Sequence, residues 1–326
     1  MSAARAAGAI LAGVDEAGLG PLLGSLAIGY SAFLVPAPDS DPWKLLRGTV
    51  ARTPRKGARL VVADSKLVFQ RNARGEKRLE TTALAFLALR DGRIGRVGAE
   101  LLGGALAPEE REKSVPWWAH LPALPWAAEP EGLELTASLL ARASARAGLT
   151  LLDAGVRVVP AAELNASYAE TENKATTVWA RVQEVLARLW ALRARAPLFV
   201  TVDMLGGRRH YGSLLARAFP EAEVRLVSET PLCSSYALAA RDGNGAMALS
   251  FRVRGERHSF AVALASCLAK YARELEMRAF NAYFAALAPE LRPTAGYRGD
   301  GSRWLEDAAA ALEKCGLARD VLVRQR

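Results

Sequence analysis

The stretch from Gly13 to Pro21 (GVDEAGLGP) constrains the fold of this chain more than any other. An apolar run with the character of a buried strand leads into it and sets two adjacent carboxylates, Asp15 and Glu16, before a glycine-rich turn. Neighbouring residues of a strand point to opposite faces, so we expect the chain to leave strand geometry here, as glycines permit. Carboxylates beside a buried run need a partner, and their hard oxygen ligands suit Mg²⁺ or Mn²⁺. A polar turn at the end of a strand is the alternative.

Composition restricts the class of protein. With 326 residues, 51% hydrophobic and 24% charged, the chain is globular and long enough for one enlarged domain or two. The net charge of +9 favours a polyanionic partner such as nucleic acid, although an arginine-rich proteome would give the same excess. Three widely spaced cysteines argue against a disulfide framework and a zinc site, and no apolar run approaches the length of a membrane span. We therefore expect a cytoplasmic, monomeric protein with no membrane contact.

Hydrophobic periodicity predicts alternating strands and helices, the pattern of an α/β sheet. Strands are expected at 9–14, 24–36, 59–63, 155–160, 198–202, 224–227, 235–240 and 246–253, and helices at 76–89, 133–147, 173–192, 211–218, 259–287 and 304–317. Segment 91–150 is the least regular and carries Trp117, Trp118 and Trp126. These rings could form a base-stacking platform or pack a small subdomain against the core.

The string from Asp15 to Gly24 (DEAGLGPLLG) resembles the opening signature of the ribonuclease HII family. That resemblance implies an α/β fold with a ribonuclease H-like mixed sheet flanked by helices. The catalytic domain would comprise 1–90 and 151–326, with an inserted subdomain at 91–150 and C-terminal helices.

Two further blocks resemble the family at strand ends. Asp64-Ser65-Lys66 is by itself a surface turn, but it resembles the Asp-Ser-Lys motif, in which Ser65 and Lys66 would contact phosphate or the active site. Asp203 ends an apolar strand and resembles the third family carboxylate, at the sheet edge where α/β proteins place their sites. In the Gly-Gly-Arg-Arg stretch that follows, Arg208 is either part of a turn or a phosphate contact.

Two more blocks lie towards the end of the chain. The segment 265–274 (ASCLAKYARE) resembles a family helix, and Ser266, Lys270 and Glu274 share one helical face at steps of four. Glu274 would then be the fourth carboxylate, where the family has aspartate. An exposed Lys270–Glu274 ion pair is the alternative. Tyr297 follows Gly296, as in the Gly-Tyr motif whose tyrosine stacks on a sugar, although a lone tyrosine also suits a core.

The resemblance implies a metal-dependent endoribonuclease that cleaves the RNA strand of RNA–DNA hybrids, or at ribonucleotides embedded in duplex DNA. Its catalytic and metal-binding residues would be Asp15, Glu16, Asp203 and Glu274, holding two Mg²⁺ or Mn²⁺ ions. Gly18-Leu19-Gly20 stands where the family has Gly-Arg-Gly, so both glycines that would allow backbone readout of the 2′-hydroxyl are present, while Leu19 replaces the arginine. The other hypotheses are a nuclease of the same fold with another nucleic-acid substrate, and a nucleic-acid-binding protein with a degraded site.

Overall fold

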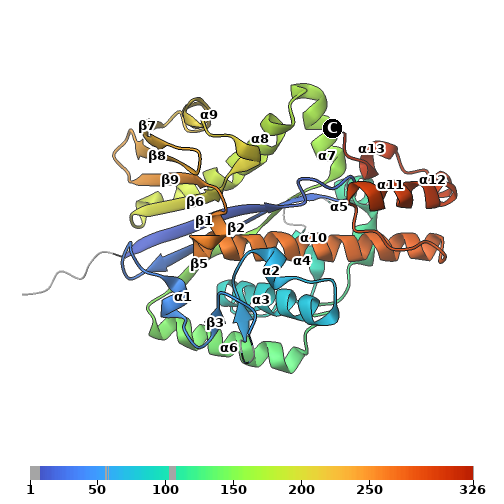
Figure 1. Cartoon of the computed structure of the whole chain (residues 1–326), viewed down its shortest axis with the longest axis horizontal. Coiled ribbons are helices and arrows are strands. Elements are labelled where there is room, and N and C mark those ends of the chain that lie inside the picture. The colour runs from blue at the N-terminus through green and yellow to red at the C-terminus, as the bar shows by residue number, and fades with distance from the viewer. Residues whose placement is uncertain (1–7, 56, 58, 103–107, 326) are drawn as a thin grey trace, which may run out of the picture.

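The computed structural model describes residues 8–55, 57, 59–102 and 108–325 (Figure 1). Their centre is a seven-stranded mixed sheet of order β5-β2-β1-β6-β9-β8-β7. Strands β1, β6 and β9 are parallel to one another, and the other neighbouring pairs are antiparallel. The strands are β1 (Ala9–Ala17), β2 (Leu26–Val35), β5 (Thr150–Val159), β6 (Leu198–Asp203), β7 (Ala222–Glu229), β8 (Cys233–Ala240) and β9 (Ala246–Arg252). A separate two-stranded sheet pairs β3 (Val50–Ala51) with β4 (Leu60–Val61).

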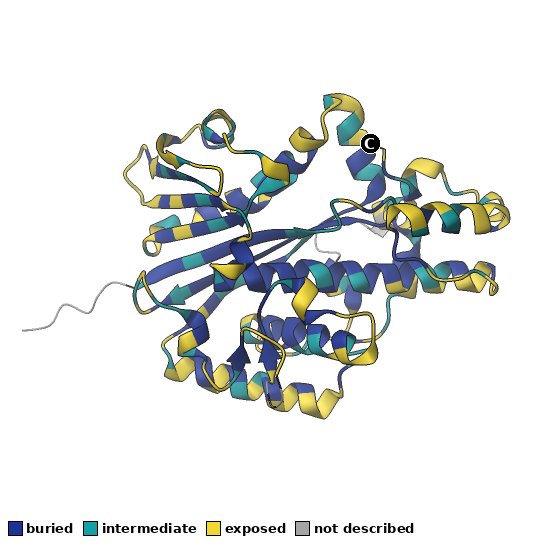
Figure 2. Cartoon of the chain, in the orientation of Figure 1, coloured by how far each residue is buried: buried dark blue, intermediate teal, exposed yellow. Residues whose placement is uncertain are grey.

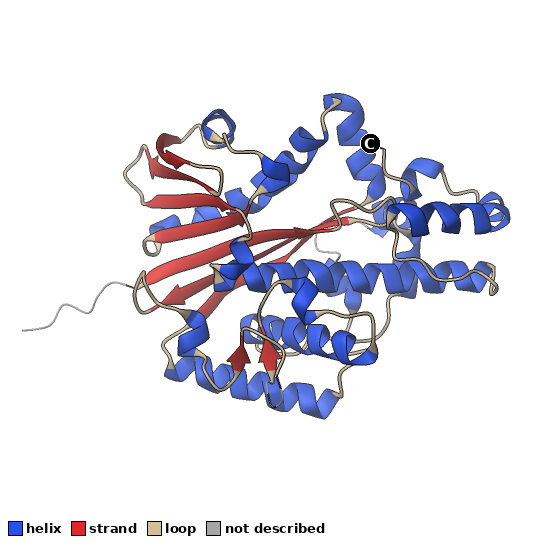
Figure 3. Cartoon of the chain, viewed as in Figure 1, coloured by secondary structure: helices blue, strands red, loops and turns tan. Residues whose placement is uncertain are grey.

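Helices cover both faces of the sheet (Figures 1 and 3). Helices α3 (Ala73–Asp91), α6 (Pro130–Arg146) and α10 (Phe260–Leu287) share one hydrophobic core, and α8 (Lys174–Trp190) and α9 (Gly212–Ala218) share the core on the opposite face. The shorter elements are α1 (Pro42–Leu45), α2 (Ser65–Val68), α4 (Gly98–Leu102), α5 (Pro108–Ser114), η1 (Pro116–His120), α7 (Ala161–Thr171), η2 (Ala191–Ala194), η3 (Leu205–Gly207), η4 (Gly255–Arg257), α11 (Arg298–Asp307), α12 (Ala309–Cys315) and α13 (Arg319–Leu322). The predicted α/β class, a mixed sheet flanked by helices, is confirmed.

Helix α10 lies directly against the centre of the sheet, and it is buried along most of its length (Figure 2). Two strand glycines permit this approach. A Cβ atom at Gly13 would lie 2.1 Å from the backbone nitrogen of Val262, and one at Gly29 would lie 2.1 Å from the carbonyl oxygen of Ala265. Because α10 is rich in alanine where it crosses these strands, its axis comes close enough to bring Ser266 to the sheet edge.

The connection from β5 through α7 and α8 to β6 is the predicted strand–helix–strand crossover. One expectation about the opening stretch is wrong. Strand β1 does not end before the two carboxylates, because Asp15 and Glu16 remain in antiparallel register with Gly29 and Ile28 of β2. The antiparallel pairing of β1 with β2 therefore continues to Ala17. The closing helical segment is also divided, into α11 and α12.

The tryptophans of segment 91–150 pack into the core. Trp117 and Trp118 are buried, and the Trp117 ring lies 5.1 Å from the ring of Phe280 in α10. Trp126 stacks on Tyr271 at 4.9 Å. The packing interpretation is thus confirmed for the two buried rings, which cannot present a face to a base. Residues 103–107 of this segment lie outside the described residues, and none of the described helices combines the length and apolar character that a membrane crossing needs.

Candidate active site

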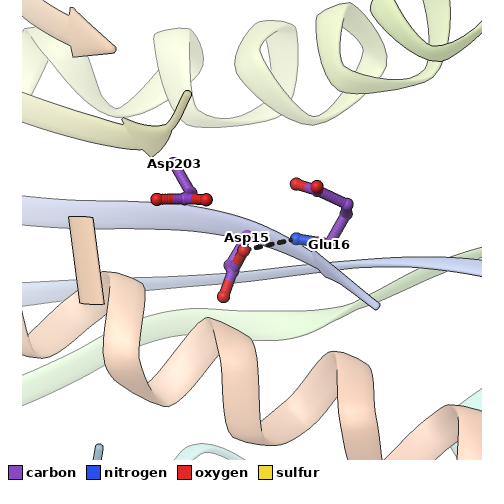
Figure 4. A group of neighbouring side chains, drawn as sticks. All are labelled: Asp15, Glu16 and Asp203. Carbon is purple, nitrogen blue, oxygen red and sulfur yellow. Dashed lines mark hydrogen bonds between the residues drawn. The ribbon is translucent and has the colours of Figure 1, made fainter. Parts of the chain in front are cut away.

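Three carboxylates converge at the ends of two neighbouring parallel strands. Val14 of β1 is in register with Val202 of β6, so Asp15 and Asp203 follow at the same sheet edge. Glu16 is the next residue of β1, and each of the three acids has one oxygen within 4.8 Å of the others (Figure 4). The parallel pairing of β1 with β6 therefore brings the three carboxylates together. The side chains of Asp15 and Glu16 nevertheless point to opposite faces of β1.

Backbone amides and one hydroxyl orient these acids. Oδ1 of Asp15 accepts a hydrogen bond of 2.8 Å from the backbone N–H of Glu16 (Figure 4). Oδ1 of Asp203 accepts one of 2.8 Å from the backbone N–H of Gly255, at the start of η4. On the α10 side, the hydroxyl of Ser266 favours the ionised form of Asp15, lowering its pKa, and accepts a hydrogen bond of 3.3 Å from the backbone N–H of Ser65. The Asp-Ser-Lys segment and α10 therefore meet beside Asp15.

Burial and mutual repulsion raise the pKa values of this cluster. Burial, followed by the charges of Glu16 and Asp203, raises the pKa of Asp15 well above its usual value. Burial and the charge of Asp203 raise the pKa of Glu16 to about 7, and burial raises the pKa of Asp203. A site that disfavours three negative charges in its free form is stabilised by a cation placed among them. The donor set consists of hard oxygens, so these residues fit a divalent ion such as Mg²⁺ or Mn²⁺.

The cluster forms the floor of a cavity of about 550 Å³ whose wall carries basic side chains. Lys66, Arg254 and Arg257 line it, together with two further acids, Asp64 and Glu256. A negatively charged floor with a positively charged wall suits a ligand that carries phosphate and binds through metal ions.

Glu256 is a site residue that the sequence analysis missed. It is buried in η4, directly after Gly255, whose backbone N–H donates to Asp203. Burial, and after it the charges of Asp203 and Asp64, raise the pKa of Glu256. The sequence shows only that Glu256 follows an apolar strand. This becomes a signal once β9 is known to be the third of the parallel strands, whose ends meet at this edge.

The structure does not bring Glu274 to the three acids. It lies eight positions after Ser266 on α10, which corresponds to about 12 Å along a helix axis. Its carboxylate instead accepts a hydrogen bond from Lys270 on the preceding turn, and the Lys270 ammonium lies 4.6 Å from the ring centroid of Phe69. The ion pair of the alternative is therefore observed, but both of its side chains are half-buried rather than exposed.

The remaining predicted substrate-binding residues fall into two groups. Ser65, Lys66 and Ser266 line the cavity, and Arg208 is half-buried just beyond Gly207 of its wall. The loop holding Gly18, Leu19 and Gly20 does not line this cavity but begins directly after β1, and the segment with Tyr297 packs beside it. The carbonyl of Gly296 accepts from the backbone N–H groups of Leu22 at 2.7 Å and Leu23 at 3.1 Å, and Tyr297 is 49% exposed.

The fold and the site define an α/β protein with a pocket at the ends of its parallel strands. Both carboxylates and basic side chains line this pocket. No protein-family model matches this chain, and no curated protein matches it either. Among solved structures, the chain is similar to RNase HII from Archaeoglobus fulgidus in its complex with PCNA, at 15% identity and a TM-score of 0.44, covering 97% of this chain and 94% of that one. It is also similar to Bst-RNase HIII in complex with Mn²⁺ (16% identity, TM-score 0.45, covering 98% of this chain and 66% of that one). A third similar structure is ribonuclease H2 from Pyrococcus horikoshii OT3 (16%, TM-score 0.38, covering 96% and 92%).

Proposed function

We propose that this protein is a metal-dependent endonuclease of the ribonuclease H type, which hydrolyses the RNA strand of RNA–DNA hybrids or cleaves at ribonucleotides embedded in duplex DNA. The observation that carries the proposal is the group formed by Asp15, Glu16 and Asp203, whose oxygens lie within 4.8 Å of one another. The resemblance of the Asp15–Gly24 stretch to ribonuclease HII supplies the substrate class.

In this proposal Asp15, Glu16 and Asp203 hold Mg²⁺ or Mn²⁺. Glu256 supplies a further carboxylate, in the place that the resemblance gives to Glu274, because Glu256 lines the same cavity. Bound divalent ions supply the activation of an attacking water and the stabilisation of the leaving 3′-oxygen.

The other residues of the site bind and orient the nucleic acid. Lys66, Arg254 and Arg257 line the cavity and compensate phosphate charge. Ser266 holds the Asp15 carboxylate in position through its hydroxyl. The exposed part of the 18–20 loop offers backbone groups to a ribose 2′-hydroxyl, and the half-exposed Tyr297 offers a ring to a sugar.

Cleavage assays on matched substrates test the proposal. The purified protein is incubated with Mg²⁺ or Mn²⁺ and one of three labelled duplexes: an RNA–DNA hybrid, DNA with a single ribonucleotide, and plain DNA. We expect cleavage of the two ribonucleotide-containing duplexes, with 3′-hydroxyl ends. We also expect a loss of at least about a thousandfold for Asp15→Asn, because one metal ligand loses its charge.

Each other outcome identifies an alternative. Cleavage of plain DNA at a similar rate would assign a nuclease with another substrate, consistent with Leu19 in place of the family arginine. Binding of duplexes without cleavage in either metal would assign a nucleic-acid-binding protein. Cleavage that Asp15→Asn leaves intact would refute the site.

A further inference from the structure

The loop that follows the two carboxylates of β1 is held from inside by two arginines from distant parts of the chain. The first, Arg273 of α10, donates to the carbonyl of Ser25 at 2.7 Å and to that of Leu23 at 3.1 Å. The second, Arg324, lies just after α13. Its Nε donates to the carbonyl of Gly24 at 2.6 Å, and its Nη1 donates to the carbonyl of Gly18. One guanidinium therefore connects the two ends of the 18–24 loop.

The loop backbone requires these contacts. Gly18 and Gly24 both have positive φ angles, 87° and 78°, so their carbonyls turn away from the strand ladder and need donors from elsewhere. A Cβ atom at Gly18 would lie 2.9 Å from Cδ of Arg273, which shows how closely the arginine packs against the loop. The planar fork of Arg324 can serve both carbonyls at once, whereas a single ammonium group has no such fixed geometry.

The segment that carries Arg324 is itself docked on the loop. The backbone N–H of Arg324 donates to the carbonyl of Leu22 at 3.0 Å, and Leu23 forms an isolated β-bridge with Val323. On its other side the backbone N–H of Gln325 donates to Oδ1 of Asn165 in α7 at 2.7 Å, and Figure 1 shows the end of the described chain beside that helix.

Holding Arg324 in this position is electrostatically costly. Arg324 and Arg273 are both buried and repel each other, while the charge of the buried Glu276 carboxylate favours the charged form of each. Burial and the charge of Arg273 lower the pKa of Arg324 to about 9. Buried charges with incomplete compensation oppose folding, so the hydrogen bonds of Arg324 to the carbonyls of Gly18 and Gly24 have to offset this cost.

The outer side of the same loop is open. Gly20 is exposed, and a Cβ atom there would have no heavy atom within 4 Å. The loop begins two residues after Glu16, and the half-exposed Tyr297 lies beside it through the contacts of Gly296. The loop is therefore fixed on its inner side and presents the exposed backbone of Gly20 on its outer side, a short distance along the chain from the carboxylates. A rigid, pre-formed backbone binds a partner without an ordering cost.

We infer that Arg324 is a positioning residue for nucleic-acid binding, which fixes the 18–24 loop by bridging the carbonyls of Gly18 and Gly24. This inference rests on the proposed function. Arg324 itself touches neither the carboxylates nor the substrate and acts through the loop.

The test compares wild type with Arg324→Ala and with Arg319→Ala, which removes an exposed arginine from the same segment. Hydrogen exchange is measured by mass spectrometry on peptides that cover 18–25. The Kd for a labelled RNA–DNA hybrid is measured with Ca²⁺ in place of Mg²⁺, and KM and kcat are measured with Mg²⁺. We expect Arg324→Ala to speed exchange in the loop at least tenfold and to raise Kd and KM about tenfold, with kcat within about threefold of wild type. Arg319→Ala should match wild type in each measurement.

Arg324→Lys provides the comparison if the alanine variant does not fold, because it retains the charge but cannot bridge two carbonyls in the same way. Unchanged loop exchange, or unchanged Kd and KM in a folded Arg324 variant, would overturn the inference while leaving the proposed function intact. A kcat loss with unchanged KM would also overturn it, because Arg324 would then act on the carboxylates. If wild type binds no hybrid, the proposed function fails, and the inferred role of Arg324 in binding fails with it. The exchange data then report only whether Arg324 holds the loop.

Discussion

At the scale of single residues, the charge of Asp15 works against folding of the metal-free protein. Asp15 is buried and its pKa is raised by burial and by two neighbouring carboxylates. Asn at this position keeps the Oδ1 acceptor that binds the Glu16 N–H and removes the charge. We expect Asp15→Asn to raise the free energy of unfolding of the metal-free protein by about 1 to 3 kcal/mol at neutral pH. Wild type should gain thermal stability when Mn²⁺ replaces EDTA, and the variant should not. Thermal unfolding with each additive measures both effects, and destabilisation of the metal-free variant would contradict them.

The raised pKa of Glu16 gives a pH dependence of defined sign. At a pH between the usual carboxyl value and about 7, the folded metal-free protein retains a proton on Glu16 that the unfolded chain has released. Stability therefore falls as pH rises through this interval. We expect the melting temperature of wild type relative to Glu16→Gln to decrease between about pH 5 and about pH 7.5 in EDTA, because only wild type carries the titrating group. An increase over the same interval would contradict the raised pKa. With Mn²⁺ the wild-type decrease should shrink, since a bound cation favours the ionised carboxylate.

Arg254 combines a strained backbone with a side chain in the cavity wall. Its φ angle is 54°, in the left-handed region that L-residues avoid at a cost of about 1–2 kcal/mol. We expect Arg254→Gly to be more stable than Arg254→Ala by about 1 kcal/mol, because only glycine adopts this conformation freely. Both variants lose the same cation, so both should bind an RNA–DNA hybrid three- to tenfold more weakly than wild type. Denaturant unfolding and fluorescence anisotropy measure the two effects. Equal stability of the variants, or wild-type affinity in either, would show that the strain or the phosphate contact is absent.

The residues of the site differ in how far sequence could predict them. Asp15, Glu16 and Asp203 end apolar strands, and the rule that parallel strands end at one edge is enough to bring them together. Glu274 was expected from the resemblance of its helix to a family helix, and the steps of four show which residues share a face but not how far along the helix the site lies. Glu256 follows the segment 246–253, which the sequence marks as a strand without indicating its neighbours in the sheet. Its place at the site depends on the pairing of β9 with β6, which no local pattern records.

At the scale of elements, the contact between α10 and the sheet sets the position of the site. A Cβ atom at Gly13 would lie 2.1 Å from the backbone of Val262, and backbone cannot move aside as a flexible side chain does. We expect Gly13→Ala to reduce the free energy of unfolding by about 3 kcal/mol, the upper part of the range for overpacked cores. Gly299→Ala is the matched control. That position is exposed on α11 with no heavy atom within 4 Å of an added Cβ, so it should be neutral or slightly stabilising. Urea denaturation of both variants decides, and equal stabilities would contradict the close contact.

Periodicity predicted the major elements because each of them buries a continuous apolar face. It predicted α8 and α10 well, since their apolar residues recur at steps of three and four. The periodicity predicted that β1 ends before Asp15, which is too early. Pairing with β2 keeps the chain extended through Asp15 and Glu16, whose charges suggest a turn. The docking of segment 319–325 on the 18–24 loop could not be predicted from the sequence. This contact joins residues about three hundred positions apart, and it is made to backbone carbonyls, which every residue has.

At the scale of the whole molecule, the net charge of +9 has two possible origins, a polyanionic partner or a general arginine bias. Salt dependence separates them. A cation that contacts a phosphate releases a counterion on binding, so log Kd against log salt concentration has a slope of about 0.9 for each contact with double-stranded DNA. We expect hybrid affinity to fall steeply with salt, and we expect Lys66→Ala, which removes a cation from the cavity wall, to reduce the slope by about one. Lys314→Ala, which removes an exposed cation from α12, should leave the slope unchanged. Fluorescence anisotropy titrations at several salt concentrations provide both slopes. A slope that falls equally for the two lysines would mean that the charge acts as a diffuse field, whereas a fall for Lys66 alone means that phosphate is bound at the acidic cavity itself.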